Sequence, residues 1–269
     1  MPAMGPAEIE LFVEAAVSAA RAGGLVLREQ ARDLDALVVD EKAANDFVSA
    51  ADHASEKVII RYLRERFPDH SVVAEESRED RRGSPYTWVI DPLDGTTNFI
   101  HGVPIYSVSV SLLHESRVVA GAVHDPVRDE MFRAGAGQGA FLDEDPIHVA
   151  GRNGLAGCLL ATGFPYKMQE RLTDYLRSFE AFARATAGIR RAGSAALALS
   201  YVACGRFDGF WEMSLSPWDV AAGSLIVREA GGVASDFLGR DGFMKTGNIV
   251  AANPRVHAAM LDVLRRTLA

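Results

Sequence analysis

An apolar stretch that begins at Trp88 ends in two aspartates, Asp91 and Asp94, which a glycine and two threonines follow. If this stretch is an interior strand, Asp91 lies at its carboxyl end, where open α/β sheets bind ligands. Pro92 lacks a backbone donor and fixes φ, so we expect the chain to leave the sheet there. A helix that starts after Gly95 would point its first N–H groups at the same place. Carboxylates beside such donors suit Mg²⁺ together with a phosphate, although Asp-Pro and Asp-Gly are also ordinary turn sequences.

Three further acids stand where local structure alone could account for them. Asp219 lies three residues after Ser216 at a predicted helix start, and Asp52 stands in the same relation to Ser49, so each could complete a capping box. Glu75 ends a short predicted strand and could be solvated. Yet Glu75, Asp219 and the two aspartates above all lie at strand ends or helix starts. Oxygen ligands without histidine or cysteine favour Mg²⁺ or Mn²⁺ over zinc.

Length and composition suit a globular protein of 269 residues, as one large domain or two tightly joined halves. The net charge of −8 argues against a nucleic-acid-binding protein, but allows anionic small substrates if metal ions supply positive charge. The two cysteines, Cys158 and Cys204, lack metal-ligand spacing and are interpreted as reduced core residues of a cytoplasmic protein; the sequence also allows a disulfide. Glu8, Glu10 and Glu14 interrupt the N-terminal apolar stretch, so we expect neither a signal peptide nor a membrane span.

Apolar periodicity predicts helices over residues 7–31 and about 50–66, a short strand at 71–74, and several strands between 106 and 141. A polar, glycine-rich stretch, 142–157, is the expected internal boundary. Beyond it we expect strands at 158–161, 207–212, 233 and 249, and helices at 168–186, 194–204, 217–230 and from 254. This mixture predicts an α/β protein whose α+β first half, 1–145, carries most metal ligands and whose α/β second half, 146–269, completes one compact unit.

Two long segments resemble the signature motifs of the inositol monophosphatase family. They are Trp88-Val-Ile-Asp-Pro-Leu-Asp-Gly-Thr-Thr-Asn-Phe-Ile-His-Gly102 and Trp218-Asp-Val-Ala-Ala-Gly-Ser-Leu-Ile-Val-Arg-Glu-Ala-Gly-Gly232. Glu75-Glu76-Ser77 and Gly193-Ser-Ala-Ala196 lie in the family's order and spacing. The resemblance runs from about residue 15 to 264 and is greatest to the bacterial inositol-1-monophosphatases. It implies a layered αβαβα sandwich, as in inositol monophosphatase and fructose-1,6-bisphosphatase, and a homodimer.

The resemblance also implies two to three Mg²⁺ ions per active site. Glu75, Asp91 and the backbone carbonyl of Leu93 resemble the ligands of the first ion. Asp91, Asp94 and Asp219 resemble those of the second, with Asp91 bridging the two ions. A third, weaker ion would share Glu75 through water. Millimolar Mg²⁺ dependence and inhibition by Li⁺ are further family properties that we expect here.

Catalytic and substrate-binding roles transfer in the same way. Thr96 matches the threonine that activates the attacking water together with Glu75, and Asp52 matches the acid that orients it. Lys42 matches a lysine near the site, on the mobile N-terminal loop. The remaining positions match residues that face the phosphoryl group or the alcohol part of the substrate: Asp94, Gly95, Thr96, Arg190, Gly193, Ser194, Ala195, Glu212 and Asp219.

The predicted chemistry is hydrolysis of a small phosphate ester, with myo-inositol monophosphate as the leading substrate. Two Mg²⁺ ions about 3.5–4 Å apart can stabilise both the attacking and the leaving oxygen, and a carboxylate between them stays ionised, so Asp91 is not expected to be the base. Glu212 favours a polyol, because its carboxylate can accept hydrogen bonds from adjacent hydroxyls. Two residues depart from the family pattern, Ala198 and Ser216, and they concern substrate preference and subunit contacts.

The same site residues are also compatible with other functions. Family relatives hydrolyse fructose 1,6-bisphosphate, histidinol phosphate, NADP(H) or adenosine 3′,5′-bisphosphate, so the alcohol could differ while the chemistry stays the same. A different class of function is that of a metal-binding adaptor that docks on another cellular machine through its surface, alone or in addition to catalysis. We expect neither a membrane partner nor direct nucleic-acid binding.

Overall fold

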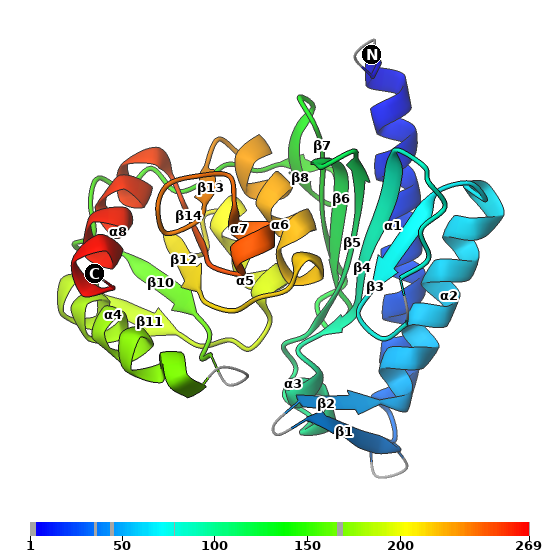
Figure 1. The fold of residues 1–269 in the computed structure, drawn as a ribbon, viewed down its shortest axis with the longest axis horizontal. Helices are drawn as coiled ribbons and strands as arrows, with labels where there is room; N and C mark the ends of the chain where they lie inside the picture. The colour runs from blue at the N-terminus through cyan, green and yellow to red at the C-terminus, as the bar shows by residue number, and fades with distance from the viewer. Residues whose placement is uncertain (1–3, 35–36, 44–45, 78, 166–168, 269) are drawn as a thin grey trace.

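The computed structural model describes residues 4–34, 37–43, 46–77, 79–165 and 169–268. Two β-sheets alternate with three layers of helices (Figure 1). Helices α1 (Pro6–Gln30) and α2 (Ala50–Arg66) cover the outer face of the first sheet. Helices α5 (Ala195–Ala203) and α6 (Pro217–Glu229) fill the space between the sheets, and α4 (Leu172–Ala185) and α8 (Pro254–Thr267) cover the second sheet. The predicted αβαβα sandwich is confirmed.

The first sheet is mostly antiparallel, with strand order β3-β4-β5-β6-β7-β8-β9; only β3 and β4 pair in parallel. Its strands are β3 (Ser71–Ala74), β4 (Tyr86–Asp94), β5 (Ser107–His114), β6 (Arg117–Asp125), β7 (Glu130–Gly135), β8 (Gly139–Leu142) and β9 (Asp145–Pro146). Trp88 and Ile90 of β4 are fully buried. Both faces of the sheet are covered by helices, so β4 is apolar and buried from Trp88 to Ile90, just before Asp91.

The second sheet has strand order β11-β10-β12-β14-β13, with β10 parallel to both β11 and β12. Its strands are β10 (Leu159–Thr162), β11 (Gly188–Arg190), β12 (Gly209–Glu212), β13 (Val233–Ser235) and β14 (Ile249–Ala252). A short hairpin of β1 (Val39–Ala43) and β2 (Asp46–Ser49) precedes α2. Short helical segments complete the chain: α3 (Thr96–Ile100), η2 (Gln169–Arg171) and α7 (Phe243–Thr246).

Sequence periodicity located the long elements well. The helices predicted at 7–31 and 50–66 are α1 and α2, and the strand predicted at 71–74 is β3.

Cys158 is buried, and both cysteines are free, so the disulfide that the sequence allowed does not form. In the part of the chain that the structure describes, no helix combines the length and the apolar character that a bilayer span requires.

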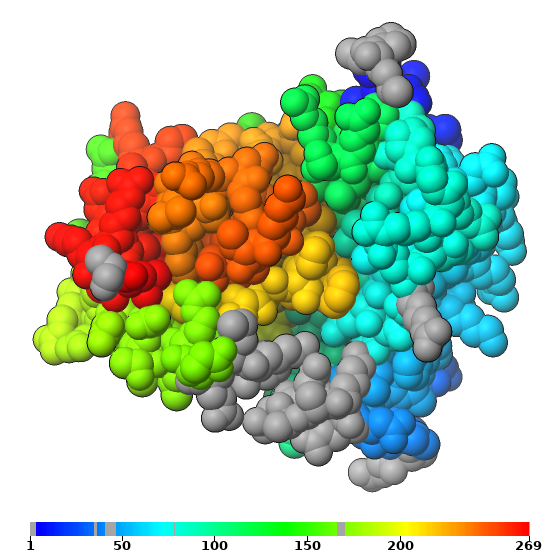
Figure 2. All heavy atoms as spheres, in the orientation of Figure 1, coloured from blue at the N-terminus to red at the C-terminus, as the bar shows by residue number. Residues whose placement is uncertain are grey.

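The middle helical layer packs very closely on the first sheet. Gly121 of β6 faces Ala222 of α6, and a Cβ built on Gly121 would lie 3.0 Å from the Ala222 Cα. Ala222 is fully buried. In the space-filling view, orange and yellow segments of the second half fill the centre and meet the green and cyan segments of the first sheet (Figure 2). Small residues at this contact therefore set how closely the two sheets approach.

We expect Gly121→Val to destabilise the protein by about 1–3 kcal/mol, because the added methyl groups would overpack the contact with α6. Chemical denaturation measures the change in the free energy of unfolding. Gly151→Val is the control, since Gly151 is exposed and a Cβ there has no atom within 4 Å. Equal effects of the two substitutions would contradict the close packing of α6 on β6.

Candidate active site

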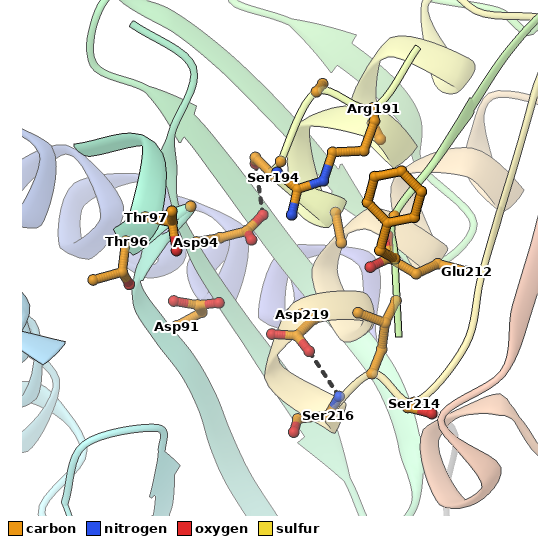
Figure 3. Close-up of a pocket in the computed structure, with 18 of the residues that line it drawn as sticks. Asp91, Asp94, Thr96, Thr97, Arg191, Ser194, Glu212, Ser214, Ser216 and Asp219 are labelled. Carbon is orange, nitrogen blue, oxygen red and sulfur yellow. Dashed lines mark hydrogen bonds between the residues drawn. The ribbon is translucent and has the colours of Figure 1, made fainter. Parts of the chain in front are cut away.

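A strongly acidic pocket opens between the two sheets, where β4 ends and where α3, α5 and α6 begin (Figure 3). Every predicted metal ligand lines it, through a side chain or the backbone: Glu75, Asp91, Leu93, Asp94 and Asp219. Glu212 lies on the opposite wall. Among the lining residues that the structure describes, Arg191 alone carries a positive charge. The pocket therefore favours cations over anions until metal ions change its charge.

A break in strand register turns both motif aspartates toward the pocket. Side chains alternate between the faces of a strand, so Asp91 and Asp94 would point to opposite faces of a regular β4. The pairing of β4 with β5 shifts between these two residues. The Leu93 backbone N–H donates to Asp91 Oδ1 over 3.0 Å, which fixes this carboxylate at the bend. Asp91 is 1% exposed and Asp94 8% exposed, so both are enclosed by the protein.

Asp94 is anchored by the second half of the chain. Its Oδ2 accepts hydrogen bonds from the Ser194 hydroxyl, over 2.6 Å, and from the Ala196 N–H, over 2.7 Å. Ser194 also caps α5, because its Oγ accepts from the Leu197 N–H over 3.2 Å. Asp94 is thus held in place by residues about a hundred positions away in the sequence.

The two predicted capping acids do cap their helices. The Ser216 N–H donates to Asp219 Oδ2 over 2.7 Å, and the Ser49 N–H donates to Asp52 Oδ2 over 2.8 Å. Capping does not remove either acid from the site. Asp219 lines the pocket, and Asp52 accepts a hydrogen bond from the Thr96 hydroxyl at Oδ1, over 3.0 Å. The same hydroxyl lies 3.1 Å from the Leu93 carbonyl oxygen.

Burial and mutual repulsion raise the pKa values of the pocket acids. Burial raises the pKa of Asp91 well above its usual range, and the charges of Glu75, Asp94 and Asp219 raise it further. Burial raises the pKa of Asp94 to about 6, although the bonds from Ser194 and Ala196 oppose the shift. The pKa of the Asp52 carboxyl is also raised by burial. Charged together, these acids need nearby positive charge.

The donor set fits a hard divalent cation such as Mg²⁺. Carboxylate and carbonyl oxygens converge, and the described pocket lining contains neither histidine nor cysteine. Within the described ranges, no three acidic, histidine or cysteine side chains form a ready-made metal cluster. Mg²⁺ keeps several waters and binds substrate phosphate directly, so water and phosphate oxygens would complete the coordination that the protein oxygens begin.

The wall opposite the metal-ligand candidates carries a buried acid, an arginine and an aromatic ring. Glu212 ends β12 with its carboxylate against Gly163. A Cβ on Gly163 would lie 1.9 Å from Glu212 Oε1, so any side chain there would displace the carboxylate. Burial raises the pKa of Glu212 well above its usual range, the charges of Asp219 and Asp94 add to this, and Arg191 opposes it. The Arg191 guanidinium stands 5.7 Å from the ring centroid of Phe164. Together these residues offer hydrogen-bond acceptors and donors on one surface.

The structure brings most of the predicted site residues together. Gly95, Thr96, Gly193, Ser194, Ala195 and Glu212 line the pocket with the metal-ligand candidates, as do the two departures, Ala198 and Ser216. Asp52 lies behind Thr96. The side chain of Lys42 is outside the described part of the protein.

Arg190 is not among the residues that line the pocket. It ends β11, is exposed, and donates from Nη1 to the carbonyl oxygen of its neighbour Ile189 over 3.2 Å. The next residue, Arg191, lines the pocket instead. A one-residue step along an extended chain changes the side to which a side chain points, and the sequence offered two adjacent arginines. Of the two arginines, Arg191 is therefore the one that lines the pocket, and the substrate contact of Arg190 stays a prediction.

The pKa of Asp94 predicts how the stability of the metal-free protein depends on pH. The pKa of Asp94 in the folded protein, about 6, exceeds the ordinary 3.8. Protonation of Asp94 therefore stabilises the folded state fully below about pH 4, and this contribution is lost as the pH rises through 6. In chelator, we expect the wild-type protein to lose stability relative to Asp94→Asn between about pH 4 and pH 7. Thermal unfolding of both proteins measures this difference.

Added Mg²⁺ should reverse the trend, because it binds the ionised carboxylates of the folded chain. A melting-temperature gap between wild type and Asp94→Asn that is constant with pH in chelator would contradict the raised pKa.

Comparisons with known proteins agree with this geometry. The inositol monophosphatase family model matches residues 8–268. Nus factor SuhB of Escherichia coli strain K12 is 46% identical over 254 residues, covering 94% of this chain and 95% of the relative. Nus factor SuhB of Pseudomonas aeruginosa is 46% identical over 255 residues, covering 93% and 94% of the two chains.

Solved structures show the same fold. The extragenic suppressor protein suhB of Bartonella henselae superposes with a TM-score of 0.91 at 39% identity, covering 94% of this chain and 98% of that one. The inositol monophosphatase of Anabaena gives a TM-score of 0.86 at 39% identity, with 96% of each chain covered.

Proposed function

The chain belongs to the inositol monophosphatase family, and we propose that it is a Mg²⁺-dependent phosphomonoesterase that hydrolyses myo-inositol monophosphate to inositol and phosphate. The observation that carries the proposal is the convergence of Asp91, Asp94 and Asp219 on one pocket with Glu75 (Figure 3). Glu212 on the facing wall supports a polyol as the alcohol part.

The proposed metal ligands follow from this arrangement. Glu75, Asp91 and the Leu93 carbonyl would hold one Mg²⁺, and Asp91, Asp94 and Asp219 would hold a second. When bound, Mg²⁺ supplies Lewis-acid stabilisation of the phosphoryl charge and lowers the pKa of a bound water. Mn²⁺ suits the same oxygen ligands.

Thr96 and Asp52 would orient the attacking water. The Thr96 hydroxyl has a single proton, and its geometry directs that proton at Asp52 Oδ1 or the Leu93 carbonyl, 3.0 and 3.1 Å away. The oxygen of Thr96 is then left as an acceptor for a hydrogen of the water. Glu75, which also lines the pocket, would accept the water's other proton. The N–H groups of Gly95 and Thr96 would bind phosphoryl oxygens.

The test of this function is a hydrolysis assay on a panel of phosphate esters, with Mg²⁺ and with chelator. We expect phosphate release from myo-inositol monophosphate that requires Mg²⁺ and exceeds release from fructose 1,6-bisphosphate, histidinol phosphate, NADP and adenosine 3′,5′-bisphosphate. Faster hydrolysis of another ester would keep the chemistry and change the substrate, whereas full activity after exhaustive chelation would reject the metal mechanism.

Asp91→Asn should lower turnover about 100-fold or more at saturating Mg²⁺, because it removes the charge that two ions would share. The fold should persist, since the substitution relieves repulsion among the acids. Steady-state kinetics and thermal unfolding measure both effects. Asp208→Asn is the control: Asp208 is 7% exposed and bonds the Leu159 N–H away from the pocket. Near wild-type turnover of Asp91→Asn would disprove the bridging role.

Glu212→Gln should raise the KM for myo-inositol monophosphate about tenfold, which corresponds to about 1.4 kcal/mol, the scale of one hydrogen bond to a charged group. Its effect on a hydroxyl-poor phosphate ester should be small, because the lost contact is to the alcohol and not to the phosphoryl group. Steady-state kinetics on both esters decide the question, and equal losses on the two would count against alcohol recognition.

A Nus-factor role in addition to catalysis is a second candidate, supported by the names of relatives 46% identical to this chain. The Asp91→Asn variant separates the two roles, since it should lose hydrolysis while keeping the surface intact. The homodimer and the sensitivity to Li⁺ that the family resemblance implies stay predictions, as does the cytoplasmic location that the cysteines indicate.

A further inference from the structure

Asn98 joins two segments that are remote in sequence, just behind the pocket. It lies on α3, and its side-chain Nδ2 donates to the Ile105 carbonyl oxygen over 2.7 Å and to the Ala192 carbonyl oxygen over 2.8 Å. Both amide hydrogens are therefore used. Asn98 is 8% exposed, and its replacement by alanine would remove both hydrogen bonds.

The Ala192 carbonyl belongs to the segment that anchors Asp94. Within four residues of it, Ser194 and Ala196 supply the two hydrogen bonds to Asp94 Oδ2, at 2.6 and 2.7 Å. The Ser194 hydroxyl also lies 3.2 Å from that of Ser107, on the first sheet. A shift of residues 192–196 would therefore move the Asp94 carboxylate directly.

The contact between α3 and this segment is too close for any side chain other than glycine's. A Cβ on Gly193 would lie 2.6 Å from Asn98 Nδ2, and the backbone there has a φ of +91°. Gly95 approaches from the other side: its φ is +103°, and a Cβ would lie 3.2 Å from the Gly193 carbonyl oxygen. Two left-handed glycines thus let the two backbones meet, and neither carries a side chain that could hold them together.

We propose that Asn98 is a positioning residue that clamps residues 192–196 to α3 and so holds Asp94 in place for metal binding. The bond to the Ala192 carbonyl holds that segment to α3, and the bond to the Ile105 carbonyl fixes the amide of Asn98 in place. It rests on the proposed metal-dependent function, and residues that orient metal ligands indirectly typically change metal affinity about 10- to 100-fold when replaced.

The test compares Asn98→Ala with Asn253→Ala. Asn253 is also buried and also donates from Nδ2 to two carbonyls, those of Ala150 and Arg152, at 2.7 and 3.2 Å, but it caps α8 away from the pocket. Both variants should lower the melting temperature. Only Asn98→Ala should weaken Mn²⁺ binding, by about tenfold, as measured from the free Mn²⁺ signal in electron paramagnetic resonance, and raise the Mg²⁺ concentration for half-maximal turnover.

Asn98→Asp separates positioning from simple electrostatics. The carboxylate keeps the shape of the amide but cannot donate to either carbonyl, and it adds a negative charge near the pocket. Electrostatics alone would tighten Mn²⁺ binding, whereas loss of the clamp would weaken it. Weaker binding in both Asn98 variants supports the proposal.

Unchanged or tighter Mn²⁺ binding in the Asn98 variants, or an equal loss in Asn253→Ala, would overturn the positioning role. Because Mn²⁺ binding is measured without substrate, this failure is distinct from failure of the proposed hydrolysis, which would appear as a wild-type protein that binds metal and releases no phosphate.

Discussion

The repulsion between carboxylates buried in one pocket is the constraint on which the rest of the site depends. Burial and the charges of neighbouring acids raise the pKa of Asp91, so the metal-free pocket is costly to ionise. The chain stabilises it with local donors. The Leu93 N–H holds Asp91, Ser194 and the Ala196 N–H hold Asp94, and the Ser216 N–H holds Asp219. These bonds fix geometry without supplying the positive charge that a metal ion would bring.

Such a site cannot be assembled from one segment. Asp91 and Asp94 come from the first sheet, Asp219 from a helix between the sheets, and the donors to Asp94 from another such helix. The layered fold brings them together only because the layers pack closely, as at Gly121 against Ala222. The Ser109 hydroxyl on β5 donates to the Trp218 carbonyl oxygen over 3.2 Å, which ties the start of α6 to the first sheet. Packing in the middle layer thereby sets the distance between metal ligands.

Periodicity and strand-end chemistry were enough to predict the long helices and a shared site for Glu75, Asp91, Asp94 and Asp219, because these features depend on neighbouring residues. The αβαβα order of the layers came from the family resemblance. The β1–β2 hairpin was not predicted, since Asp40, Glu41 and Asp46 interrupt any apolar alternation. Nor could the sequence choose between Arg190 and Arg191 or show what Asn98 contacts. Those properties depend on which distant part of the chain lies next to these residues after folding. Ala192, for example, is 94 residues from Asn98 in the sequence.

Capping a helix and serving the site, which the sequence presents as alternative explanations of Asp52 and Asp219, are compatible in the folded protein. A carboxylate has two oxygens, and a capping bond occupies only one of them. In Asp52, Oδ2 accepts from Ser49 while Oδ1 accepts from Thr96, the residue beside the metal-ligand candidates. The helix start fixes the carboxyl group and aims it at the pocket. An acid three residues after a serine at a helix start can therefore cap the helix and contribute to a site at the same time.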